Sequence, residues 1–250
     1  MTLKDDLLKH QIFIQRLGSS HAKDITSTLA KAISMGIKAL KDNPDGMSKQ
    51  DLRLLHTKII EVVQGIKDSQ IGLLVQTAIY EAKFLAKRLE KHLLDEAILP
   101  STKDLRTAVE KEKMSIVSGK QKKTIPLVYT QFANTKAHEI MLVVSDASLE
   151  KEEVVEKGTN KLLLLGAGLF AVQALTLATT STTQAASAAR QQVYKQNKIP
   201  LVDWVTELDS DVCEDCEALG SNGPYEVNDT EIPPEHWNCR CVLVPVEEDE

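Results

Sequence analysis

Residues 71–93 read IGLLVQTAIYEAKFLAKRLEKHL, and this stretch decides the fold class. Its apolar side chains recur every three or four positions, the spacing that places them on one face of an α-helix. The period lasts about six turns and stops before Pro100. The sequence therefore predicts a long amphipathic helix here. The positions on its apolar face are Ile71, Val75, Ala78, Ala82, Leu85, Leu89 and Leu93.

The residues before this stretch show the same helical period. Apolar positions recur from Ile25 to Leu40, with Ser19 or Ser20 as the expected cap, and again from Leu52 to Ile66. Asn43-Pro-Asp-Gly46 predicts a turn between these two helices, because a residue before proline avoids the helical region. Ser48-x-x-Asp51 and Ser101-x-x-Asp104 resemble capping boxes and predict two helix starts.

Composition supports a helical core. Aromatic residues make up only 4% of the chain, so packing must rest on Leu, Ile, Val and Ala, which suits helices better than a β-sandwich. We expect a mainly α fold with an elongated helical N-terminal body at residues 1–160. A connecting helix should follow at 161–198. A small, irregular α+β module resembling a zinc knuckle, with an acidic tail, should occupy 199–250.

The connecting segment contains the most apolar stretch of the chain. Residues 162–179 read LLLLGAGLFAVQALTLAT, slightly shorter than the roughly 20 residues that a membrane span needs. The stretch also contains Gln173 and continues into a Thr/Ser/Ala-rich helix. It predicts a buried or intersubunit helix, with a membrane-active helix as the alternative. Gly166 and Gly168 indicate close helix packing, because no strand-turn-helix context for a dinucleotide loop surrounds them.

Charge divides the chain into two regions of opposite sign. The net charge is −6, yet residues 1–200 hold 29 Lys and Arg against 21 Asp and Glu. Residues 201–250 hold one Arg against 15 acidic residues. A basic body favours a polyanionic partner, whereas an acidic module would be repelled by DNA and favours a protein partner. The lysine run at 120–123 predicts a solvated loop, with a DNA contact as the alternative.

All four cysteines lie between residues 213 and 241, and the first 212 residues have none. The chain opens without the basic segment and apolar core of a secretory signal, so we expect a reducing, cytosolic compartment. Clustered cysteines in such a compartment indicate metal or redox chemistry rather than structural disulfides.

The cysteines and one histidine form two short motifs, Cys213-x-x-Cys216 and His236-x-x-Cys239-x-Cys241. Paired motifs of this kind supply the tetrahedral sulfur and nitrogen ligands that Zn²⁺ prefers. Five candidates compete for four positions, so the site contains either four Cys or three Cys with His236. We expect structural zinc, because so small a module can hardly build a core of its own. Thiol redox chemistry and inert reduced thiols are the alternatives.

No catalytic signature accompanies these motifs. The remaining histidines are scattered over helical positions without ligand spacing, and no Ser-His-Asp order, phosphate loop or paired-carboxylate motif stands out. We therefore expect no enzymatic activity.

The motifs around the cysteines resemble a known family. Trp204, Asp209-x-Asp-x-Cys213-x-x-Cys216, Gly220, Tyr225, Pro233-Pro-x-His236-x-Asn-Cys239-Arg-Cys241 and Pro245 are similar to the C-terminal signature of tailed-phage head-morphogenesis proteins, the Mu F-like minor head proteins. The resemblance covers about residues 185–246. The usual family ending is His-Pro-Asn-Cys-Arg-Cys, and here Trp237 replaces the proline.

This resemblance implies a structural minor head protein, made in the bacterial host cytoplasm and located in the virion at the head interior or portal vertex. It would dock on the portal protein or the major capsid protein and act in head assembly or in DNA packaging and delivery. Packaged DNA would contact the basic helical body. The alternatives are an internal virion protein ejected with the DNA that acts on the host membrane, and a zinc-dependent nucleic-acid-binding protein.

Overall fold

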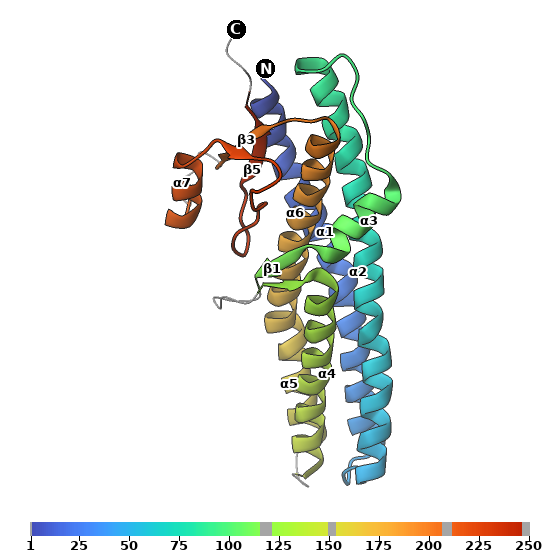
Figure 1. Ribbon diagram of the computed structural model, residues 1–250. Coiled ribbons are helices and arrows are strands. Elements are labelled where there is room, and N and C mark those ends of the chain that lie inside the picture. Colours follow the sequence, from blue (N-terminus) through green and yellow to red (C-terminus); the bar gives the residue numbers. More distant parts are fainter. Residues whose placement is uncertain (1, 116–121, 150–153, 207–211, 247–250) are drawn as a thin grey trace. The chain divides into compact units, whose positions relative to one another are not determined.

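The computed structural model describes residues 2–115, 122–149, 154–206 and 212–246, and the chain is mainly helical, as predicted (Figure 1). Its internal contacts divide the chain into two compact units. Unit 1 consists of Met1–Ser19, Ile71–Ile125 and Leu177–Glu250, and unit 2 of Ser20–Gln70 and Pro126–Thr176. The division into residues 1–160, 161–198 and 199–250 stays a prediction.

The helices are long because the helical periods continue through most of the sequence. They are α1 (Leu3–Asp42), α2 (Lys49–His92), α3 (Thr102–Lys111), α4 (Ile125–Leu149), α5 (Val154–Leu164), the π-helix η1 (Leu165–Phe170), α6 (Ala171–Gln196) and α7 (Glu214–Ser221). The strands are β1 (Lys113–Ser115), β2 (Lys122–Thr124), β3 (Leu201–Val205), β4 (Tyr225–Glu226) and β5 (Val242–Pro245).

Both predicted helix starts are capped by their serine. The backbone N–H of Asp51 donates to Ser48 Oγ over 3.2 Å at the start of α2. Asp104 N–H donates to Ser101 Oγ over 3.1 Å at the start of α3. In the predicted turn, Gly46 N–H donates to the Asn43 carbonyl over 3.1 Å. These hydrogen bonds satisfy backbone donors that the first helical turn leaves without partners.

The cap predicted at Ser19 or Ser20 is wrong. Helix α1 begins at Leu3, and Ser19 lies inside it, where its hydroxyl donates to the Gln15 carbonyl over 3.1 Å. Leu7 and Ile14 are fully buried, so the apolar face extends to the first turn of the helix. Burial of this face stabilises helix where the local serine pattern suggested a start.

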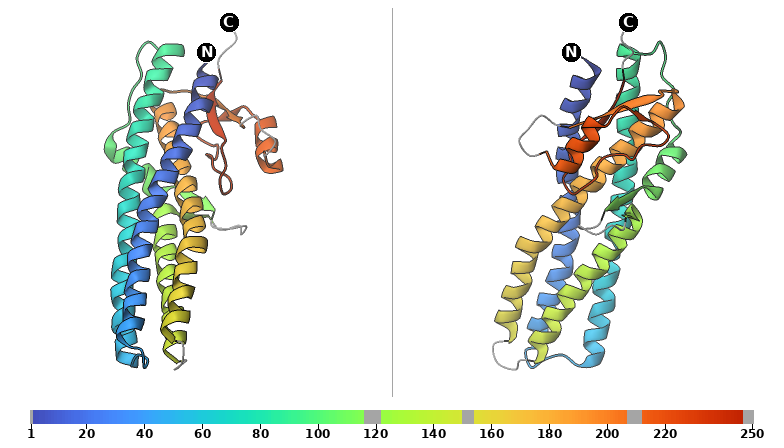
Figure 2. Two further views of the ribbon diagram at one scale, coloured as in Figure 1. Left: turned by 180° about the vertical axis from the view of Figure 1, so that it is seen from behind. Right: turned by 60° about the vertical axis from the view of Figure 1, so that its left-hand side comes forward.

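The described residues of unit 2 are helical except for the turn at residues 43–48 between α1 and α2. Segments of α1, α2, α4 and α5 lie alongside one another in it (Figure 2). Gly158 of α5 is the closest meeting point, since a Cβ there would lie 2.8 Å from both Leu40 Cδ1 of α1 and Ala147 Cβ of α4. A larger residue would force these helices apart.

Unit 1 combines helices with the small strands. Its helical core contains a buried ionic network in which the Arg190 guanidinium on α6 pairs with Glu81 on α2. His10 Nε2 on α1 lies 2.7 Å from the same carboxylate. Arg190 Nη1 also donates to Gln11 Oε1 over 3.0 Å. All four side chains are buried, so the network links three helices by polar contacts inside the core.

The strands of unit 1 form two small antiparallel sheets. Strand β1 pairs with β2, and a three-stranded sheet has the order β4-β3-β5, with Val202 opposite Pro245 and Val205 opposite Val242. We refer to residues 199–246 as the Cys/His module. Helix α6 holds the module through Tyr194, whose hydroxyl donates to the Leu243 carbonyl over 2.9 Å.

Within the described residues, one helical run, Val155–Gln196, is long and apolar enough to cross a membrane by length and composition. The predicted buried or intersubunit helix at 162–179 is buried on one face only. Leu162, Phe170 and Leu177 are buried, whereas Leu164 and Val172 are 73% and 63% exposed.

Candidate metal centre

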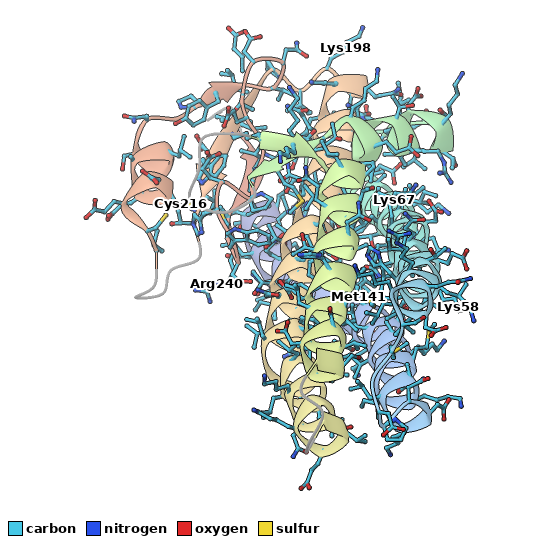
Figure 3. All side chains as sticks on the ribbon, turned by 90° about the horizontal axis from the view of Figure 1, so that it is seen from below. Lys58, Lys67, Met141, Lys198, Cys216 and Arg240 are labelled. Atoms are coloured by element: carbon cyan, nitrogen blue, oxygen red, sulfur yellow. The ribbon has the colours of Figure 1, made fainter. Side chains whose placement is uncertain are left out.

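The first ligand pair is positioned by the start of α7. Cys213 is the N-cap residue of this helix, and its sulfur accepts a hydrogen bond from Cys216 N–H over 3.4 Å. Cys216 lies in the first turn, 1% exposed, and its sulfur is visible beside α7 in Figure 3. The Cys-x-x-Cys spacing therefore turns both sulfurs toward one end of the helix.

The second pair enters along the segment that leads into β5. Cys239 and Cys241 are buried, and Cys241 directly precedes the strand. Asn238 has a positive φ of 60°, the left-handed conformation that asparagine tolerates better than most residues. Its backbone N–H donates to Thr180 Oγ1 over 3.3 Å, and its side-chain oxygen accepts from Thr179 Oγ1 over 3.2 Å. Helix α6 thus fixes the turn that carries these two cysteines.

His236 is oriented by its neighbour. Its Nδ1 lies 2.9 Å from the backbone carbonyl of Trp237, which accepts a hydrogen bond only if Nδ1 carries the proton. Nε2 is then left with a lone pair, and it lies 3.2 Å from the sulfur of Cys216. A hydrogen bond from the far ring nitrogen to a backbone carbonyl is a common way to orient a metal-binding histidine. That carbonyl belongs to Trp237, which replaces the proline in the usual ending of the family that the motif resembles.

The ligand atoms fall into two overlapping groups. Cys213, Cys216 and His236 form one group, and Cys216, Cys239 and Cys241 form the other, with all ligand atoms of each group within 4.8 Å of one another. Cys216 belongs to both. The sulfurs of Cys216 and Cys239 are 3.7 Å apart, close to the ~3.8 Å edge of a tetrahedron with Zn–S bonds of about 2.3 Å. All five predicted residues thus converge and can hold a metal ion.

The thiols interact strongly with one another. Hydrogen bonds from the Cys216 and Cys241 thiols lower the pKa of Cys239. The same contact with Cys239 raises the pKa of Cys216, because two neighbouring sulfurs do not ionise independently. All four cysteines are free thiols. A bound cation would favour the ionised form of each cysteine that binds it, because a cysteine ligand must be a thiolate.

Two further features of the sequence pattern are described by the structure only in part or not at all. Asp209 and Asp211 fall outside the described residues. The lysine run lies partly outside them, and Lys122, one of its two described lysines, pairs with Glu231 and Glu235 of the module. Neither these contacts nor the threonines that hold Asn238 were predictable from the sequence, because nothing local marks a partner more than fifty residues away.

Comparison with known proteins assigns the family. Residues 115–244, just over half of the chain, match the family described as Phage Mu protein F like protein. The matched range includes all five candidate ligands. No curated protein and no solved structure matches the chain. The protein belongs to the Phage Mu protein F-like family, a structural family of virion-associated phage head-morphogenesis proteins.

Proposed function

We propose that the protein is a structural minor head protein of a tailed phage that docks on the portal or on the capsid interior. The observation that carries this proposal is the family match over residues 115–244, which spans the helices α4 to α6 and most of the Cys/His module. Membership of a head-morphogenesis family supports a role in head assembly or in DNA packaging and delivery.

We further propose that the Cys/His module holds one structural Zn²⁺. The supporting observation is that three buried thiols, a half-buried thiol and an oriented imidazole converge around Cys216. The donor set fits zinc, which takes sulfur and nitrogen ligands in a tetrahedron. The bound ion would crosslink α7 to the segment before β5 and add to the small set of apolar side chains, among them Val202, Trp204 and Val242, that the module buries.

The charges of the module favour a protein surface as its partner. Residues 201–250 carry one basic residue against 15 acidic ones, so close approach to DNA would be repulsive. Lys122, from the lysine run, is already paired with Glu231 and Glu235. The basic side chains of the helices remain the better candidates for contact with packaged DNA.

The test is to delete the gene from the phage and to complement it in the host. We expect the protein among the components of purified virions by mass spectrometry. We also expect particles made without it to show defective heads or DNA content by electron microscopy. Complementation with the Cys216→Ser variant should fail, whereas the surface control Asp42→Asn should restore particles. Full infectious particles that lack the protein would contradict the proposal. Tight DNA binding with a steep salt dependence would favour the nucleic-acid alternative.

A further inference from the structure

Two exposed aromatic rings meet on the surface of unit 1, where α1 and α2 run side by side (Figure 2). Phe13 is 43% exposed and Tyr80 is 47% exposed, whereas the other aromatic side chains of the described residues are buried or half-buried. The two ring centroids lie 5.5 Å apart. The fold therefore brings its two most exposed rings together from two different helices.

These two rings rest on a second layer of rings. The imidazole of His10 stacks on the ring of Phe84 with centroids 3.5 Å apart. The rings of Phe13 and Tyr80 lie 5.4 Å and 5.8 Å from the same imidazole. His10 is itself fixed by Glu81 in the buried network. Rings that are held in place in this way lose little freedom when a further flat group stacks on them.

Basic side chains flank both exposed rings at spacings of three, four or seven positions along the helices. Residues at these spacings share one face of a helix. The flanking side chains are exposed, and they are Lys9 and Arg16 on α1 and Lys83 and Lys87 on α2. We call these four residues, together with Phe13 and Tyr80, the aromatic–basic face.

Negative charge is almost absent from the same stretches. Residues 9–16 and 80–88 contain five basic residues and one acidic residue, Glu81. Glu81 is fully buried and pairs with Arg190, so it does not reach the surface. The fifth basic residue, Arg88, lies 5.1 Å from the ring centroid of Phe84 and also pairs with Asp6. The surface around the two rings is therefore positively charged and fits a polyanion.

The mixture of rings and cations on one face fits a single-stranded nucleic acid. Cations pair with its phosphates, and rings stack on its bases in any sequence, because every base has a flat face. A duplex hides these faces in its own stack and offers mainly phosphates to such a surface. A helix that lies on a membrane carries its basic and apolar residues on opposite faces, whereas here they share one face.

We propose that the aromatic–basic face binds single-stranded nucleic acid, with bases stacked on Phe13 and Tyr80 and phosphates paired with the flanking lysines and arginine. The proposal deepens the suggested contact of the helices with packaged DNA and rests on it for its role in the phage. The binding itself is a property of the isolated protein and requires no metal ion.

The test is fluorescence anisotropy of the full-length protein with a labelled oligothymidylate of about 16 nucleotides, the upper end of common site sizes. We expect binding that weakens as salt rises, and at least about 10-fold weaker binding of a duplex of the same length. A zinc chelator should leave the binding unchanged. Failure to bind, loss of binding on chelation, or equally tight binding of the duplex would overturn the proposal.

The double variant Phe13→Leu with Tyr80→Leu removes the flat rings and keeps apolar side chains of similar size. It should bind the oligothymidylate at least about 10-fold more weakly. Its matched control is the exchange Phe13→Tyr with Tyr80→Phe, which keeps both rings and should bind like the wild type. Circular dichroism checks that both proteins keep their helices. Unchanged binding by a folded leucine variant would overturn the proposal.

The double variant Arg16→Gln with Lys87→Gln tests the cations without touching the rings. The slope of log affinity against log salt should become shallower by about 1.4, because each phosphate contact to a single strand contributes roughly 0.7. Lys38→Gln is the control, since Lys38 is 76% exposed on α1 in unit 2. It should leave the slope unchanged. Equal slopes for the double variant and the control would rule out these phosphate contacts.

The outcome is separable from the proposed role in the phage head. Oligothymidylate binding by a protein that is absent from virions would support the face and contradict that role. A virion protein that floats with phosphatidylcholine–phosphatidylglycerol vesicles but binds no oligothymidylate would overturn the present proposal, assign the face to a bilayer and leave the head role intact.

Discussion

The helices α1–α6 and the Cys/His module are held together by different physical means. The helices bury long apolar faces, and their interior holds a polar network in which Glu81 contacts Arg190 and His10. The module has three short strands and one eight-residue helix, and its buried polar centre is a set of four thiols and an imidazole. Apolar burial is the main source of stability in the first region, whereas we propose that the second region depends on a metal ion that joins its ligands.

The largest effect we expect is from removing the ligand shared by both groups. Cys216→Ser should open the module, because structural zinc contributes roughly 10 kcal/mol to the folding of small metal-held domains. Limited proteolysis should then cut within residues 199–246, while circular dichroism retains the helical signal. Cys213→Ser is the matched comparison, since Cys213 belongs to one group only. It should have the smaller effect. Equal protease resistance of Cys216→Ser and wild type would remove the distinction between the two regions.

Breaking the buried network around Glu81 should destabilise the helices and leave the Cys/His module unaffected. Arg190→Met leaves the carboxylate of Glu81 buried with only His10 beside it. The free energy of unfolding of the helices should therefore fall by about 3–5 kcal/mol. Urea unfolding followed by circular dichroism measures this loss, and zinc content should not change.

Asp42→Asn provides the control for that experiment. It breaks the exposed pair of Lys38 and Asp42, whose side chains are 76% and 56% exposed, and such pairs contribute little. An Arg190→Met variant as stable as Asp42→Asn would show that the network does not stabilise the helices.

Acid should weaken the helices through Glu81. Burial acts to raise the pKa of this carboxyl, but Arg190 and His10 outweigh it and hold the pKa below its ordinary value of 4.5. A carboxyl whose pKa is lower in the folded protein than in the unfolded chain stabilises the fold at pH values above the unfolded-state pKa. This stabilisation is lost as the pH falls through the folded-state pKa. The urea concentration at the unfolding midpoint of the wild type should therefore decrease when the pH is lowered below 4.5. The Glu81→Gln variant should have a lower urea midpoint than the wild type at pH 7, and its midpoint should decrease less on acidification. Parallel curves for the two proteins would contradict this account.

The smallest effect concerns the turn between His236 and Cys239. Asn238→Ala loses the hydrogen bond from Thr179 and disfavours the positive φ, whereas Asn238→Gly loses only the bond. We expect a destabilisation of the module of about 1 kcal/mol for alanine and less for glycine. In competition with a zinc chelator, the wild type should retain zinc most strongly, Asn238→Gly less strongly and Asn238→Ala least. A glycine variant weaker than alanine would show that backbone conformation is unimportant there.

Local patterns in the sequence were sufficient to predict the helices and several of their ends. Ser48 and Ser101 cap helices because the interaction lies within three residues, and the period of residues 71–93 directly reports a buried face. The start of α1 was mispredicted, because burial of Leu3 and Leu7 depends on distant partners that no local pattern reveals.

The candidate centre was predictable for a related reason. Cys213, Cys216, His236, Cys239 and Cys241 have the spacings of metal-binding motifs, and these motifs are local. That Cys216 joins two groups was not predictable, because it depends on where α7 lies relative to β5. The pairing of Glu81 with Arg190 was likewise hidden, since the two residues are separated by 109 positions.

The most direct test of the central claim is the zinc content of the purified full-length protein, measured by elemental analysis. We expect one zinc per chain, and its removal by a chelator should abolish protease protection in residues 199–246 but not in the helices. Metal-free protein with the same protection throughout the module would contradict it.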